Sequence, residues 1–309
     1  MKRAEILLGG SVLLATALPA VAHDSPEHVI HDLSHRIEAD GATARLLTAR
    51  AFEHQAMRNW SAAIADFNAA LELQPNHGPA ILGCAQTLIH QGALTEAAAV
   101  ARRGLALNGD AARQAPYHAL LAGISARRHE WPEALEAWRE ALKSPHPEVD
   151  WFLGEAECLA RLSRFTEQSD ALAQAMTRNP SVVLRRTWIR ALVDAGELDA
   201  ASHEIERSSA EARWKSAWLL LSARVCALRE DYAGQHAASS AALTEIRSRL
   251  NPERPDPQLI LESALALAFL GRQEEALASM KQARELGVPE ASFRAPELVA
   301  IGPPPAGHP

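Results

Sequence analysis

Two histidines one helical turn apart, with a carboxylate between them, form the pattern in this sequence that comes nearest to chemistry. His31-Asp32-Leu33-Ser34-His35 places two imidazoles at positions i and i+4, the spacing at which one helix face can hold a zinc ion. In zinc hydrolases with this spacing, a glutamate beside the first histidine acts as general base. Here that position holds the shorter Asp32, and the sequence offers no identifiable third ligand. Because glycine-rich phosphate loops, Gly-x-Ser-x-Gly turns and Cys-x-x-Cys pairs are also missing, the sequence predicts no enzyme and no cofactor.

The same segment leaves a metal-binding alternative open. Ser25 is a good N-cap and Pro26 suits the first helical turn, so we expect a helix from there to about Ala39. One face of this helix would be apolar, and the opposite face would carry the imidazoles of His28, His31 and His35. Together with His23, which lies shortly before the helix, these imidazoles could hold a transition-metal ion. The other interpretation is the polar outer face of a capping helix, which repeat arrays need for solubility.

The chain beyond residue 40 is organised by a repeat. An aromatic residue or leucine, followed three positions later by alanine or glutamine, recurs at spacings of 34, 37, 34, 33, 34 and 41 residues. The pairs are Trp60/Ala63, Leu94/Ala97, Trp131/Ala134, Phe165/Gln168, Leu198/Ala201, Tyr232/Gln235 and the degenerate Gln273/Ala276. Gly92, Gly196 and Gly271 stand two residues before the leading position, where a helix must end and the chain must turn. Each unit therefore predicts two helices of about a dozen residues.

These units resemble the tetratricopeptide repeat, a family whose unit has 34 residues. The matching residues of the first and fourth units are Leu47, Ala51, Ala63, Phe67, Ala70 and Pro75, and Phe152, Ala156, Leu159, Leu172, Ala175 and Pro180. The sequence departs from the family pattern at Arg50, His54, Gln168 and Gln235. The resemblance implies an all-α fold, a right-handed superhelical α-solenoid of about seven helix-turn-helix repeats over residues 44–288.

The resemblance also implies where a partner would bind, because in this family the first helix of each unit lines the concave face. Carrying those positions over gives a candidate peptide-binding groove: Phe52, Gln55, Gln86, His90, Arg127, Glu157, Arg161, Arg186, Arg190, Asp194 and Arg224. Its excess of arginine favours a partner with an acidic segment or a C-terminal carboxylate, since guanidinium binds carboxylates through two hydrogen bonds. The other interpretation is a solvated surface on which these arginines pair with Glu157, Asp194 and their neighbours.

The two ends of the chain differ from the array. Residues 1–22 combine a positive start, an apolar run and an Ala-Val-Ala cleavage pattern, as a secretory signal peptide does. We therefore expect a periplasmic or secreted protein without a membrane span after cleavage. The expected divisions are a signal peptide at 1–22, a His-rich capping helix at 23–43, the repeat array at 44–288 and a Pro-rich tail at 289–309.

Charge and cysteine content narrow the function further. The chain has 31 Lys and Arg against 38 Asp and Glu, a net charge of -7, which disfavours a nucleic acid partner. Its three cysteines lie two units apart, too far for disulfides, so we expect free thiols. The sequence thus predicts an exported scaffold that binds a protein or peptide in its concave groove. The alternative is a metal-binding or metal-delivery accessory protein that uses the N-terminal histidines.

Overall fold

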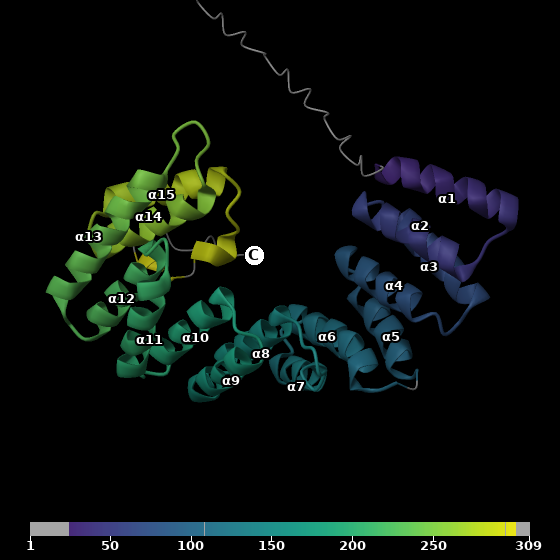
Figure 1. Cartoon of the computed structure of the whole chain (residues 1–309), viewed down its shortest axis with the longest axis horizontal. Helices are drawn as coiled ribbons and strands as arrows, with labels where there is room; N and C mark the ends of the chain where they lie inside the picture. Colours follow the sequence, from purple (N-terminus) through teal and green to yellow (C-terminus); the bar gives the residue numbers. More distant parts are fainter. Residues whose placement is uncertain (1–24, 108, 294, 301–309) are drawn as a thin grey trace, which may run out of the picture. The chain divides into compact units, whose positions relative to one another are not determined.

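A computed structural model describes residues 25–107, 109–293 and 295–300 of the chain. The expected signal peptide, His23 and the end of the Pro-rich tail lie outside the described residues. The described part contains α-helices, one short 3-10 turn and no strand (Figure 1). None of its helices is both long enough and apolar enough to cross a lipid bilayer.

The chain divides into two compact units, residues 1–108 and 109–309, at the insertion expected near Asn108-Gly109-Asp110. The helices of the first unit are α1 (Pro26–Asp40), α2 (Ala44–Ala56), α3 (Trp60–Leu73), α4 (Gly78–His90) and α5 (Leu94–Leu105). Those of the second are α6 (Ala111–Arg127), α7 (Trp131–Ala141), α8 (Val149–Arg161), α9 (Phe165–Arg178), α10 (Val182–Asp194), α11 (Leu198–Glu211), α12 (Ser216–Leu228), α13 (Tyr232–Arg249), α14 (Pro257–Phe269), α15 (Gln273–Glu285), the 3-10 turn η1 (Glu290–Phe293) and α16 (Pro296–Val299).

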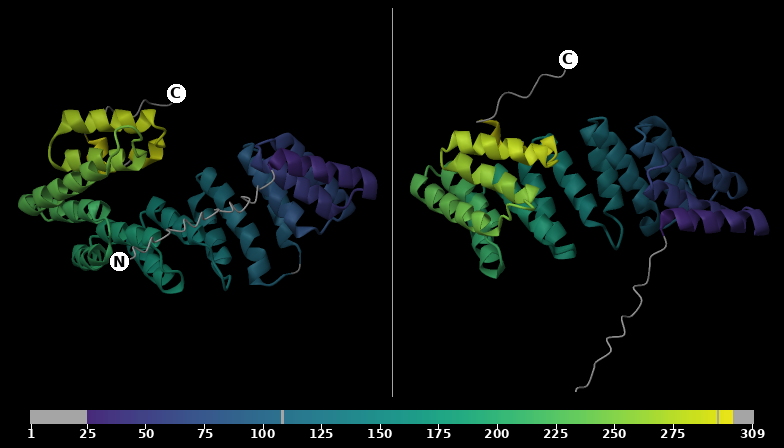
Figure 2. Two further views of the ribbon diagram at one scale, coloured as in Figure 1. Left: turned by 45° about the horizontal axis from the view of Figure 1, so that its top comes forward. Right: turned by 90° about the horizontal axis from the view of Figure 1, so that it is seen from above.

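From α2 to α15 the helices form seven consecutive pairs, and within each unit the successive helices lie beside one another from both directions of view (Figure 2). The leading residue of every predicted unit is the first residue of the second helix of a pair, from Trp60 in α3 to Gln273 in α15. The predicted all-α solenoid with its repeat register is therefore confirmed. The exact limits of the signal peptide, the His-rich capping helix, the repeat array and the Pro-rich tail remain a prediction.

Small residues let the paired helices approach closely. The alanines Ala63, Ala97 and Ala134 are completely buried. A Cβ added at Gly83 would lie 2.3 Å from the ring of Phe67, and one added at Gly154 would lie 2.3 Å from that of Trp138. The aromatic side chain of one pair thus fills the space that a glycine leaves in the next, which gives the interior its packing density.

Two departures from the family pattern hold the first helix in place. Arg50 donates hydrogen bonds of 2.7 Å from Nε and Nη2 to the buried Asp66 carboxylate. Its Nη1 donates a third, of 3.0 Å, to Ser34 on α1, and His54 Nε2 lies 4.0 Å from Asp66. Arg50 and His54 therefore form a polar network that joins α1, α2 and α3.

The turns inside the pairs use a left-handed residue. Gly92, Gly196 and Gly271 have φ of 80°, 80° and 71°. The corresponding residues of the other four pairs are not glycine, although their φ lies between 57° and 61°: Arg58, His129, Ser163 and Glu230. For such residues this conformation costs about 1–2 kcal/mol each.

The described part of the Pro-rich tail folds back as η1 and α16, which we call the C-terminal arm (residues 289–300, without residue 294). Phe293 and Leu298 are buried in a cluster with Ile260, Leu261 and Met280 of the last helix pair. The arm therefore covers the apolar face of the last described helix pair.

Candidate functional site

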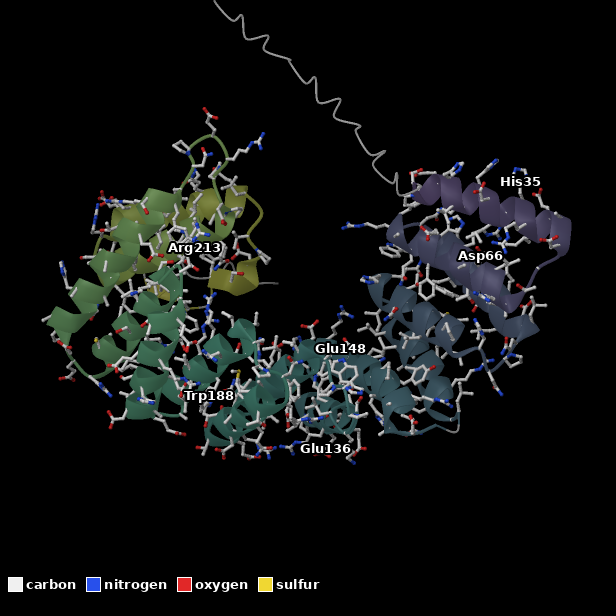
Figure 3. The ribbon with its side chains drawn as sticks, viewed as in Figure 1. His35, Asp66, Glu136, Glu148, Trp188 and Arg213 are labelled. Carbon is white, nitrogen blue, oxygen red and sulfur yellow. The ribbon has the colours of Figure 1, made fainter. Side chains whose placement is uncertain are left out.

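The three described histidines of α1 do not come together as a metal site. His31 and His35 approach to 3.1 Å between their Nε2 atoms, on the exposed side of α1 (Figure 3). His28 lies instead 3.8 Å from Asp32, and His35 also faces Glu38 at 3.7 Å. The structure therefore gives no support to the metal-binding alternative, whose fourth candidate ligand, His23, lies outside the described residues. Among the residues that the structure describes, no group of three or more His, Cys, Asp or Glu could hold a metal ion.

The candidate groove residues of the first unit are largely engaged in packing. Phe52 contacts Phe67 edge to face with 5.2 Å between ring centroids, and Gln55 Nε2 donates a 3.3 Å hydrogen bond to Thr87. His90 stacks on Trp60 at 5.0 Å, while Gln86 is half-buried. These residues join the first and second helix pairs.

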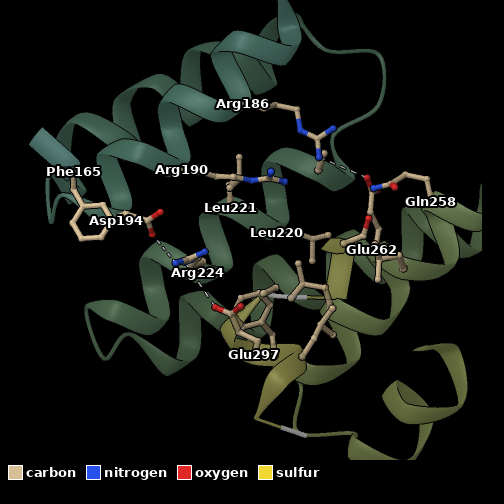
Figure 4. A pocket seen from close by; sticks show the side chains of 17 residues that line it. Phe165, Arg186, Arg190, Asp194, Leu220, Leu221, Arg224, Gln258, Glu262 and Glu297 are labelled. Carbon is tan, nitrogen blue, oxygen red and sulfur yellow. Dashed lines mark hydrogen bonds and ion pairs between the residues drawn. The ribbon is translucent and has the colours of Figure 1, made fainter. Parts of the chain in front are cut away.

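The second unit brings four of the predicted residues into one cavity of about 630 Å³: Arg186, Arg190, Asp194 and Arg224 (Figure 4). The first three lie at four-residue intervals on one face of α10, and Arg224 lies on α12. Phe165 of α9, helix α14 and the C-terminal arm form the remaining walls. The first helices of three successive pairs, α10, α12 and α14, therefore form most of this cavity.

The remaining candidates of the second unit do not line the cavity. Arg161 donates a 3.3 Å hydrogen bond to Glu157 and lies over the ring of Trp131, 5.2 Å from its centroid. Arg127 is exposed at the end of α6. Arg161 and Glu157 thus form a solvent-exposed ion pair, as the second interpretation of the arginine-rich surface expects.

Two of the three cavity arginines face carboxylates. Arg224 donates a 2.8 Å hydrogen bond to Asp194 and has Glu297 of the arm 3.9 Å from its Nε. Arg186 Nη2 lies 3.9 Å from Glu262 of α14. Sequence reasoning found Asp194 but missed Glu262 and Glu297. Of the missed two, only Glu262 carries a local signal, since it is a lone carboxylate in an otherwise apolar helix.

Arg190 lies between these pairs and has no partner of its own. It makes no hydrogen bond or ion pair with any residue in the described part of the chain, and it lines the cavity as a solvent-exposed residue. Burial lowers the pKa of Arg190, and the nearby charges of Arg186 and Arg224 lower that pKa further. The guanidinium stays charged at neutral pH all the same. In Arg186 of the same helix, Nε is buried without a hydrogen-bond partner among the described residues.

Apolar side chains complete the cavity. They come from α12, α14 and the arm: Leu220, Leu221, Leu261, Leu265, Phe269 and Leu298. Three of them, Leu261, Leu265 and Phe269, recur every four residues along α14 and so form an apolar stripe on one face of that helix. Among the residues that the structure describes, the site thus combines one unpaired guanidinium, that of Arg190, with an apolar wall.

Helices paired in a row place this chain among the all-α solenoid proteins. Two sequence models of the tetratricopeptide repeat match residues 54–124 and 124–182. The chain belongs to the tetratricopeptide repeat family.

Solved structures with the same fold include a tetratricopeptide repeat protein from Parabacteroides merdae ATCC 43184, with a TM-score of 0.56, 14% identity and coverage of 90% of this chain and 98% of that one. Pseudomonas aeruginosa pilF aligns with a TM-score of 0.51 at 15% identity, covering 64% and 89%. PilW, a type IV pilus biogenesis factor, aligns with a TM-score of 0.50 at 18% identity, covering 66% and 94%. The comparison with curated proteins gave no match.

Proposed function

We propose that this protein is a binding scaffold that receives an acidic segment or a C-terminal carboxylate of a protein or peptide in the cavity of its second unit. The observation that supports this most directly is Arg190, a charged guanidinium without a partner at the wall of an open cavity. A carboxylate that enters the cavity would accept charge-assisted hydrogen bonds from this guanidinium, which are stronger than those between neutral groups.

Export is part of the same proposal. The signal-peptide pattern of residues 1–22 would place the protein and its partner in the periplasm or outside the cell. The proposal is one of binding and assigns no reaction and no cofactor to the chain.

A single substitution tests the proposal. Arg190→Gln removes the free cation and should abolish capture of the partner from the exporting compartment, since an anchoring arginine contributes about 2 kcal/mol or more to binding. The melting temperature should stay nearly unchanged or rise, because Arg190 has no partner to lose among the described residues. Arg186→Glu would be a less suitable test, because the new carboxylate would face the buried carboxylate of Glu262 and could destabilise the fold.

Arg161→Gln is the matched control. It removes an inward-facing arginine that already pairs with Glu157 outside the cavity, so it should leave capture intact. A partner that the Arg190→Gln variant retains as well as wild type does would refute the proposed site.

A further inference from the structure

The charges around the cavity restrict how many negative groups it can receive. Arg224 is already held by Asp194 and faces Glu297, and Arg186 faces Glu262, so among the described residues of the cavity only Arg190 has no carboxylate within ion-pair distance. A second negative group placed here would meet no further unpaired arginine of the described cavity, and the carboxylates already present would repel it. The geometry therefore suits one carboxylate better than a run of acidic residues.

The size and the walls of the cavity restrict what carries that carboxylate. About 630 Å³ falls in the range of pockets that enclose a small ligand, so the cavity can enclose a few residues at a chain end. Leu220, Leu261 and Leu265 line the same cavity as the arginines, so the rest of a bound ligand meets hydrocarbon.

The C-terminal arm places the same combination in the cavity. Glu297 directs its carboxylate toward Arg224, and the next residue, Leu298, is buried against the last helix pair. An acidic group adjacent to a leucine side chain is thus already accommodated by this wall. In that position Glu297 also neutralises the cation that a second ligand carboxylate would need.

We infer that the cavity binds a free protein C-terminus whose last residue is large and apolar, with its single carboxylate on Arg190. Glu297 is the specificity-determining residue that excludes ligands with two adjacent carboxylates. This inference rests on the proposed function and makes it narrower.

Calorimetric titration with four synthetic peptides tests the ligand class. The peptides are acetyl-Gly-Gly-Ala-Leu as the free acid, its C-terminal amide, and free acids ending in glycine or aspartate instead of leucine. The leucine acid should bind most tightly. The amide should bind at least about tenfold more weakly, because it loses a charge-assisted hydrogen bond. The glycine and aspartate peptides should also be weaker, since one lacks the apolar group and the other carries a second charge.

Substitution of Glu297 tests the specificity. Glu297→Gln releases Arg224 and should tighten binding of the aspartate peptide by about tenfold while changing the leucine peptide little. Glu290→Gln is the matched control on the same arm, because Glu290 pairs with Arg284 away from the cavity, and it should change neither. Arg190→Gln should abolish binding of both peptides.

The outcomes separate the two levels of the proposal. Equal binding of acid and amide, or no binding of the leucine acid, overturns the inference. Tightest binding of the aspartate peptide by wild type also overturns it, yet leaves the proposed function standing if that binding needs Arg190. The proposed function itself is rejected only if the Arg190→Gln variant captures the partner as well as wild type does.

Discussion

Cys158 shows how strongly the interior changes a single side chain. Its thiol is buried in α8, and burial, together with the charges of Glu157 and Glu155, raises its pKa to about 11. Burial also raises the pKa of Cys84 and of the half-buried Cys226. All three cysteines are free, as the spacing of the repeats predicts.

These thiols should react slowly with a thiol reagent while the protein is folded. At pH 8 about one Cys158 side chain in a thousand is a thiolate, so its modification should be on the order of a hundredfold slower than that of free cysteine. Mass spectrometry after timed labelling checks this, with protein unfolded in guanidinium as control. Rapid labelling of Cys158 in the folded chain would contradict the burial of this residue.

The residues that sequence reasoning placed correctly are those whose neighbours are local. Arg186, Arg190 and Asp194 share a helix face because four-residue spacing fixes it, and the repeat register adds Arg224. Glu262 and Glu297 reach the same cavity from a later pair and from the arm, so only the tertiary fold brings their charges there. The helical spacing also brings His31 and His35 of α1 together, but it does not fix the direction of His28, which lies beside Asp32.

Among the structural elements, the turns inside the helix pairs repeat one backbone conformation with different residues. The sequence marks this turn clearly where glycine occupies it, as at Gly196. At Ser163 the same left-handed conformation is imposed on a residue that disfavours it, because the packing of α8 against α9 requires the chain to reverse there.

Exchanging the residues at these two turns should therefore shift stability in opposite directions. Ser163→Gly should raise the free energy of unfolding by about 1 kcal/mol, and Gly196→Ser should lower it by a similar amount. Urea unfolding followed by circular dichroism measures both. If Ser163→Gly destabilises the protein, the serine makes a contribution to the turn that outweighs its strain.

At the scale of the whole molecule, the chain consists of two compact units, and every residue of the cavity belongs to the second. In repeat proteins stability comes from contacts between neighbouring repeats, so five consecutive helix pairs hold one another without help from distant ones. Asp110 is also the N-cap of α6, because its side-chain carboxylate accepts a 3.0 Å hydrogen bond from the Arg113 backbone N–H.

A fragment that begins at Gly109 should accordingly fold and bind by itself. Its circular dichroism spectrum should be helical, and its affinity for the leucine-ending peptide should equal that of the full chain. The same titration with residues 23–108 is the control and should show no binding. An unfolded fragment, or one with markedly weaker affinity, would mean that the second unit depends on the first.

The composition of the cavity has a consequence for how this chain can evolve. Its walls come from Phe165 of α9, from the three helix pairs that follow and from the arm, so each pair contributes different side chains to one site. Gain or loss of a whole repeat, the commonest way for such arrays to change length, would leave a folded solenoid if it fell among the earlier pairs. The same event between α10 and α16 would keep the fold and separate Arg190 from Glu297, so selection on repeat number should be strictest there.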